Sequence, residues 1–388
     1  MTGHILFTGK YMKGFKKAWE DLGYRFYEAP EELTKEPSEK NRKIIRNAME
    51  RQNIDMIFSF DFMPGVSIAC AELNICYISW IWDCPHNSLL HKSAREKTNQ
   101  IFVFDYVQYQ DLLARGFQNV YYLPLSPDCD GFMEVIEKDA GKSRARFGEE
   151  VVFLGNIYND DKHGLYDKIQ YLPPYVRGYL DSLMEAQKLL WGVDLIRGGI
   201  SDAVWAEIKK YVNWDLGENY EEGIYEQIIG DMIGKKIAQL ERIEMCSYLA
   251  EHFKFTLYSG SDTSFNKNIN NKGYAMYDTQ MPLIFHYSKI NIHITIRSIT
   301  SGIPLRVMDV LACGGFLLTN YQPEIAEYFE DGKDLVIYQD LPDLYEKIAY
   351  YLEHDEEREE IAKSGQRKVR ELFHYRNQIG KILEIIGE

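Results

Sequence analysis

Residues 289–320, KINIHITIRSITSGIPLRVMDVLACGGFLLTN, carry the pattern that decides the fold. The β-branched run 290–296 predicts a buried strand, and a short turn separates it from a helix that opens near Pro304 and ends at Gly314. A second apolar run, 316–319, predicts the next strand. Strand, helix and strand in this order indicate a parallel sheet with a right-handed crossover.

The same alternation extends through both halves of the chain. Strands are predicted in the N-terminal third at 4–8, 24–27, 54–60, 76–82, 101–104 and 120–123. A second series has predicted strands at 151–154, 255–258 and 335–338, with a mainly helical stretch inside it. We therefore expect an α/β protein with two units built on parallel sheets, whose ligands bind beyond the carboxyl ends of the strands.

The length of 388 residues agrees with two domains of ordinary size. We expect an N-terminal domain over residues 1–145 and a C-terminal domain over 146–370, with a helical insertion at about 160–252. The polar run within 126–149 is interpreted as the linker between them. A final helix, 371–388, is long enough to return to the first domain.

Composition narrows the class of protein. The formal net charge of −15 disfavours nucleic acid as the main partner, although a local cluster of Arg can still hold one small anion. Six Cys without a Cys-x-x-Cys pair indicate a reducing compartment, and no apolar window is long enough to span a membrane. We expect a cytoplasmic protein. The 28 Tyr reflect either genomic composition or a cleft lined with stacking rings.

The turn before Pro304 has the chemistry of an anion site. Small residues let backbone N–H groups approach a ligand at the positive end of a helix, and Arg297 and Arg306 flank the turn. Guanidinium groups suit phosphate oxygens, and Asp309 can accept hydrogen bonds from a ribose diol. These features predict a nucleoside-diphosphate site. The alternative is that both Arg form surface ion pairs at an ordinary helix start.

Candidate acid–base residues follow two strands of the first domain. Asp61 ends the 54–60 strand, and Asp83 and His86 follow the 76–82 strand. A carboxylate and an imidazole at this edge suit proton removal from an acceptor hydroxyl. The alternatives are a helix cap for Asp83 and a structural role for His86. The residues have no metal-ligand spacing motif, so no metal is expected.

Several motifs together resemble a known family. They are 301–306, 314–320, 332–334, 357–362 and His374 in the second half, and 77–86, 102–105 and 121–125 in the first. The motifs of the second half are similar to the C-terminal half of CgeB-like, spore-maturation type glycosyltransferases, a branch of the GT-B superfamily. The motifs of the first half resemble the N-terminal module that usually accompanies it. The resemblance spans nearly the whole chain.

The resemblance implies two facing Rossmann-like domains, with a nucleotide sugar in the C-terminal one and the acceptor on the N-terminal side. It also implies no metal and no cofactor, with a UDP-sugar as the default donor. Retaining members of the superfamily often carry two Glu with seven residues between them, and here Ser301 and Asp309 occupy those positions. Asp309 stays the ribose candidate, while the first acid is absent.

The expected site residues form two groups. The acid–base candidates are Asp61, Asp83 and His86. The expected nucleotide-sugar contacts are Gly155, Asn156, Tyr158, Arg242, Tyr258, Arg297, Ser301, Gly302, Ile303, Pro304, Arg306, Asp309 and Asn320. Within the second group, the turn at Gly155 resembles the glycine loop of the superfamily, and Tyr258 is placed near the base. Arg242 is either a phosphate ligand or a solvated helix charge.

The sequence supports two main functions. The first is transfer of a sugar from a nucleoside-diphosphate sugar to an acceptor, which is a protein, a glycan or a surface polymer. The second is a catalytically silent protein that binds nucleotide or carbohydrate in spore-coat or surface assembly, which the missing first acid favours. A sugar-phosphate epimerase or phosphorylase is less favoured, because no motif marks a lysine for a pyridoxal cofactor.

Overall fold

The computed structural model describes residues 3–30, 33–160, 164–169, 171–212, 214 and 216–387, with the backbone alone at residue 168. The chain forms two compact units. Unit 1 comprises Met1–Asp128, Asp215–Tyr225 and Phe373–Glu388, and unit 2 comprises Cys129–Trp214 and Glu226–Leu372. The chain therefore enters unit 2 after Asp128, earlier than the sequence-based boundary at 145, and a short excursion at 215–225 returns to unit 1.

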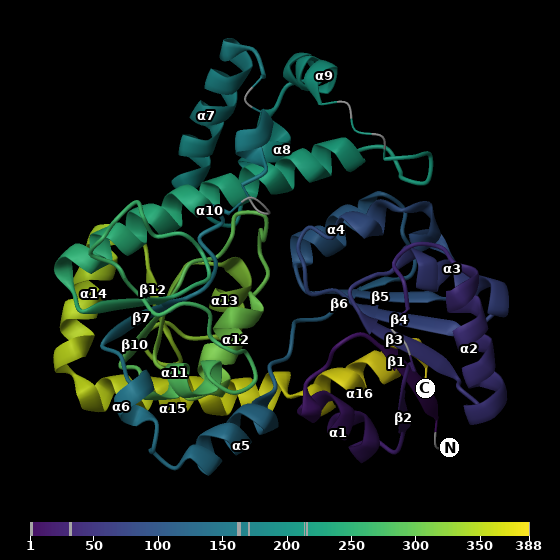
Figure 1. Cartoon of the computed structure of the whole chain (residues 1–388), viewed down its shortest axis with the longest axis horizontal. Coiled ribbons are helices and arrows are strands. Elements are labelled where there is room, and N and C mark those ends of the chain that lie inside the picture. The colour runs from purple at the N-terminus through teal and green to yellow at the C-terminus, as the bar shows by residue number, and fades with distance from the viewer. Residues whose placement is uncertain are drawn as a thin grey trace. The chain divides into compact units, whose positions relative to one another are not determined.

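Unit 1 is built on a parallel sheet with strand order β2-β1-β3-β4-β5-β6 (Figure 1). Its strands are β1 (His4–Thr8), β2 (Arg25–Glu28), β3 (Met56–Phe60), β4 (Cys76–Trp80), β5 (Asn99–Val103) and β6 (Val120–Tyr122). All of the paired strands run parallel, as the strand-helix alternation predicts. Their carboxyl ends therefore share one edge of the sheet.

Alternate side chains of these strands enter two apolar layers. Leu6, Ile57 and Tyr77 belong to a core shared with α2 (Glu39–Gln52), α3 (Pro64–Leu73) and α4 (Tyr106–Ala114). On the other face, the rings of Phe7 and Phe58 pack against Phe15 of α1 (Lys13–Asp21). The C-terminal helix α16 (Tyr375–Ile386) packs on α1 and belongs to unit 1.

Unit 2 has a second parallel sheet with strand order β12-β11-β10-β7-β8-β9. Its strands are β7 (Val151–Leu154), β8 (Phe255–Tyr258), β9 (Asn270–Asn271), β10 (Ile290–His293), β11 (Leu317–Asn320) and β12 (Val336–Tyr338). One face is covered by α10 (Ile224–His252), α14 (Leu341–Glu353) and α15 (Asp355–Phe373). The order reverses between β7 and β10, and such a point in an open parallel sheet is where ligands bind.

The predicted helical insertion is a separate cluster on the long helix α10. It consists of η3 (Tyr166–Ile169), α7 (Pro174–Lys188), α8 (Leu195–Gly199) and α9 (Asp202–Tyr211) (Figure 1). These elements share a core with the N-terminal half of α10, whereas the C-terminal half of α10 packs on the sheet. One helix of 29 residues thus serves two cores.

Two sequence-based assignments are wrong. The stretch 126–149 is not a linker, because it contains α5 (Cys129–Asp139) and α6 (Arg144–Phe147). Phe132 and Ile136, one helical turn apart, are buried there among mostly polar neighbours. The tail also divides differently: α15 runs on to Phe373, and His374 caps α16 through its side chain. No helix among the described residues is long and apolar enough to cross a membrane.

Candidate functional site

A cavity of about 280 Å³ lies in unit 2 at the carboxyl ends of β7 and β8. It is lined by Leu154, Gly155, Asn156, Asp160, Tyr258, Ser259, Gly260, Tyr274, Ala275, Tyr277, Met281 and Arg306. Four of the predicted nucleotide-sugar residues are therefore in its wall: Gly155, Asn156, Tyr258 and Arg306. The sheet reverses its strand order beside β7, so the cavity is at the position where open α/β sheets bind ligands.

Arg242 of α10 is hydrogen-bonded to the turn after β7. Arg242 is 6% exposed and donates Nη1 to the carbonyl of Asn156 at 2.6 Å and Nη2 to that of Ile294 at 2.9 Å. Its guanidinium also lies 4.8 Å from the ring of Tyr158, whose backbone is left-handed at φ 64°. Arg242 therefore fixes the shape of the turn, and neither it nor Tyr158 lines the cavity.

Arg297, a predicted phosphate ligand, contacts other residues of unit 2 through its guanidinium. It is 7% exposed, forms an ion pair with Glu241, and donates to the carbonyls of Lys188 and Leu190 at 2.9 and 2.7 Å. Its guanidinium lies over the ring of Trp191. These contacts attach the segment after α7 to α10, and Arg297 is not among the residues that line the cavity.

Arg306 is the predicted arginine that reaches the cavity. It is in the first turn of α12 (Leu305–Ala312), and its side chain is 27% exposed. Nη1 lies 3.3 Å from Oδ2 of Asp309, and Oδ1 of the same carboxylate accepts a hydrogen bond from the Tyr277 hydroxyl at 2.9 Å. Asp309 is 1% exposed. The predicted ribose ligand is thus buried behind Arg306 and is not in the cavity wall.

The turn that opens α12 is itself buried. Ser301, Gly302, Ile303 and Pro304 are all buried, and Pro304 caps the helix without a side-chain hydrogen bond. Ser301 donates to the buried carboxylate of Glu324 at 2.8 Å. Asn320 accepts the Thr295 N–H at 2.7 Å and so joins the ends of β10 and β11. The structure thus places these residues in the framework around the cavity.

Sequence reasoning missed two buried groups near this cavity. His293 ends β10, and its pKa is lowered well below the ordinary value by burial and by the charges of Arg242 and Arg306. The influence of both guanidinium charges on this imidazole indicates a locally positive environment in an acidic protein. Glu149 accepts the Tyr258 hydroxyl at 3.2 Å and so fixes that ring in the cavity wall. A lone His inside an apolar strand and a Glu just before another gave no signal in the sequence.

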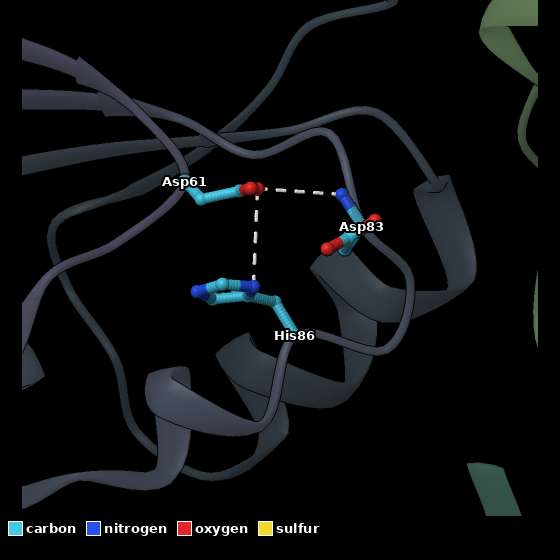
Figure 2. Close-up of side chains that lie close together, drawn as sticks. All are labelled: Asp61, Asp83 and His86. Carbon is cyan, nitrogen blue, oxygen red and sulfur yellow. Dashed lines mark hydrogen bonds and ion pairs between the residues drawn. The ribbon is translucent and has the colours of Figure 1, made fainter. Parts of the chain in front are cut away.

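In unit 1, Asp61, Asp83 and His86 come together at the carboxyl edge of the sheet, and Figure 2 shows their side chains converging. Asp61 follows β3 with a left-handed backbone, φ 60°, and its Oδ1 accepts the N–H groups of Trp82 and Asp83 at 2.9 and 3.4 Å. The turn after β4 is therefore fixed by Asp61, which brings the carboxylate close to His86.

The chemistry of this cluster depends on His86. The imidazole is 7% exposed, and Nδ1 lies 3.8 Å from Oδ1 of Asp61. Nε2 is 3.2 Å from the N–H nitrogen and 3.1 Å from the carbonyl oxygen of Phe62, so the backbone supports either tautomer. Carboxylate and imidazole atoms lie within 4.8 Å of one another. Oδ1 of Asp61 also accepts two backbone N–H groups. A carboxylate beside an imidazole can exchange a proton with it.

A family model matches the C-terminal part of the chain. Residues 240–384 match the family model described as glycosyl transferase-like. This range includes Arg242, α12 and the strands β8 to β12. No curated protein matches the chain by sequence.

Solved structures match the chain over its whole length. HepE of Anabaena, solved with UDP-glucose, aligns over 99% of each chain with a TM-score of 0.53 and 10% identity. Sucrose-phosphate synthase of Thermosynechococcus elongatus aligns over 100% of this chain and 99% of its own, at 0.54 and 10%. A UDP-forming α,α-trehalose-phosphate synthase of Burkholderia vietnamiensis aligns over 100% of both, at 0.53 and 12%.

At these identities the likeness establishes the fold, and that fold is GT-B. The two parallel α/β units agree with the fold class that the sequence predicted. The family match adds that residues 240–384 are similar to glycosyl transferases.

Proposed function

We propose that the chain transfers a sugar from a nucleoside-diphosphate sugar to an acceptor, with the donor in the cavity beside β7 and β8. The cavity carries this proposal, because it combines the glycine turn, three Tyr side chains and Arg306 at the strand-order reversal of the sheet. The family match of residues 240–384 covers α12 and supports the same use of unit 2.

Arg306 is the residue that we assign to the donor diphosphate. Its Nε and Nη2 make no hydrogen bond within the described residues, and its side chain is partly exposed to the cavity. A guanidinium stabilises the charge that develops on a leaving diphosphate, and the turn at Gly155 lets the backbone approach it. We take a UDP-sugar as the donor, which agrees with the UDP-glucose in HepE and the name of the UDP-forming synthase.

We assign the acceptor side to unit 1, with Asp61, Asp83 and His86 as its acid–base group. Attack by a hydroxyl needs a base within hydrogen-bond reach, and the cluster places two carboxylates beside a buried imidazole. The acceptor is a protein, a glycan or a surface polymer. In this proposal no metal takes part, because Arg306 and the helix dipole neutralise the diphosphate.

Within the superfamily we assign the chain to the CgeB-like, spore-maturation type, with unit 1 as its companion module. The motifs at 301–306 and 314–320 carry this assignment. We also infer a cytoplasmic location, which the nucleotide-sugar donor and the absence of any Cys pair suited to a disulfide scaffold favour. Nucleic acid is not a partner in this account, since the net charge is −15.

Nucleotide binding tests the donor assignment. The wild-type protein and Arg306→Ala are titrated with UDP, GDP, dTDP, CDP and ADP, with thermal shift and calorimetry as readouts. Arg367→Ala is the matched control, because Arg367 is an exposed arginine of unit 2 outside this cavity. We expect binding in wild type and Arg367→Ala and at least tenfold weaker binding in Arg306→Ala. Equal affinities in all three proteins would remove Arg306 from the site.

Turnover tests the acid–base assignment. Slow hydrolysis of a UDP-sugar is measured for wild type and for the double variant Asp83→Asn/His86→Ala, with and without EDTA. We expect the double variant to lose most activity and EDTA to have no effect. Activity that survives the double substitution would exclude these residues as the acid–base group. Inhibition by EDTA that Mg²⁺ or Mn²⁺ reverses would exclude the metal-free mechanism.

A catalytically silent binding protein is the second candidate. Ser301 stands where retaining relatives often carry the first acid, and its hydroxyl is bonded to Glu324. Nucleotide binding without hydrolysis or transfer across a broad donor panel would favour this candidate over the enzyme.

A further inference from the structure

We propose that Asp309, which accepts a hydrogen bond from the Tyr277 hydroxyl, acts on the donor indirectly, as a positioning residue that orients the guanidinium of Arg306 toward the diphosphate. This inference rests on the proposed donor site and changes the role of its acid. Asp309 occupies the position from which a ribose contact was expected, yet the geometry makes it a support for the arginine.

Burial is the first reason. The Asp309 side chain is 1% exposed and does not line the cavity, whereas Arg306 from the same turn of α12 does. The two residues are three apart on the helix, the spacing at which side chains meet. A ribose in the cavity therefore meets Arg306 before it meets the carboxylate.

The contacts of the carboxylate are the second reason. Oδ2 lies 3.3 Å from Nη1 of Arg306, and Oδ1 accepts the hydroxyl of Tyr277 at 2.9 Å. Both oxygens therefore already have donors. A buried carboxylate is tolerated when it is paired and hydrogen-bonded. Exchanging these two donors for the hydroxyls of a ribose would therefore give no net gain in binding free energy.

The surroundings of Arg306 are the third reason. Besides Asp309, its Nη1 contacts Sδ of Met281, and its Cζ lies 5.9 and 5.6 Å from the rings of Tyr277 and Phe285. One end of the guanidinium is thus held by a carboxylate, a sulfur and two ring faces. Nε and Nη2 remain for a ligand. A guanidinium that is already held at Nη1 loses less conformational freedom when it binds phosphate.

The test separates a ribose contact from a positioning role with two probes, UDP and inorganic pyrophosphate. Pyrophosphate has no ribose, so a direct ribose ligand does not affect its binding. Affinities are measured by calorimetry for wild type, Asp309→Asn, Tyr277→Phe, Arg306→Ala and the double variant Asp309→Asn/Arg306→Ala. Asp334→Asn is the matched control, because Asp334 is also buried and paired with a cation, Lys368, outside the cavity.

We expect Asp309→Asn to weaken UDP and pyrophosphate by the same factor, about tenfold, and Tyr277→Phe to weaken both by about threefold. In the Arg306→Ala background, Asp309→Asn weakens neither probe further. Asp334→Asn matches wild type. Loss of UDP affinity with unchanged pyrophosphate affinity, or additive losses in the double variant, would overturn the positioning role and leave the donor site standing. A wild-type protein that binds neither probe overturns the donor site itself.

Discussion

Replacement of Arg297 by Ala is expected to destabilise unit 2 and to leave the nucleotide cavity intact. The sequence placed Arg297 on the diphosphate, but in the structure it pairs with Glu241 at 3% and 9% side-chain exposure and holds two backbone carbonyls. Arg297→Ala therefore leaves a buried carboxylate without its counter-charge. The variant discriminates between a structural arginine and a ligand.

The size of the loss follows from this burial. Removing one partner of a buried ion pair costs about 3–5 kcal/mol of unfolding free energy. In a domain of about 200 residues, each kcal/mol lowers Tm by roughly 2–4 °C, so we expect a decrease of about 6–20 °C. The double variant Arg297→Met/Glu241→Met is expected to lose less than the sum of its single variants, because no charge then stays buried alone.

The loss of stability in Arg297→Ala should also depend on pH. Burial raises the pKa of Glu241 above its ordinary value, and Arg297 opposes that rise. A carboxyl whose pKa is higher in the folded state binds more protons there, so stability falls as pH rises from the unfolded pKa through the folded one. Without Arg297 the folded pKa is higher still. The difference between variant and wild type is therefore larger at about pH 8 than at about pH 5.

Thermal unfolding of wild type and Arg297→Ala across this pH range, with UDP binding measured below Tm, is the assay. We expect reduced stability and near-native affinity for UDP. Unchanged stability together with lost UDP binding would refute the structural role and return Arg297 to the diphosphate.

Three further predictions concern other parts of the chain. Gly65→Ala in α3 should lower the urea midpoint of unit 1 by an amount equivalent to about 1–3 kcal/mol, because the added Cβ would lie 2.1 Å from the Glu36 carbonyl; an unchanged midpoint would contradict that close approach. Glu149→Gln should weaken UDP binding several-fold, since the carboxylate holds the Tyr258 hydroxyl and Lys272, and unaltered affinity would show that Tyr258 needs no such support. Ellman's reagent should label Cys76 and Cys84 before the four buried thiols, and burial raises the pKa of Cys246 to about 12; early labelling of Cys246 would contradict its burial.

The fold was predictable because its strands are short apolar runs followed by turn residues. The strands at 4–8, 151–154 and 255–258 begin and end where the apolar pattern does. β9 was missed, since two consecutive Asn give no strand signal and only their pairing with β8 makes them a strand. The linker assignment failed because the three buried apolar residues of α5, Cys129, Phe132 and Ile136, were outnumbered by the charges around them.

The positions of the candidate residues were more predictable from the sequence than their contacts. Strand ends correctly placed Asp61, Asp83 and His86 together, because parallel strands share one carboxyl edge. The residue types of Arg242 and Arg297 suit phosphate, yet tertiary contacts give both of them backbone carbonyls to bind. Which cation reaches the cavity depends on the packing of α10 and α12, which a single sequence does not show. Arg306 differs from the other two by its exposure.

A crystal structure of the protein with UDP is the most direct test of the donor site. We expect the diphosphate beside Arg306 and the turn at Gly155, with the base near Tyr258 and Tyr274. UDP bound at another place on the chain, with this cavity unoccupied at a saturating concentration, would contradict it.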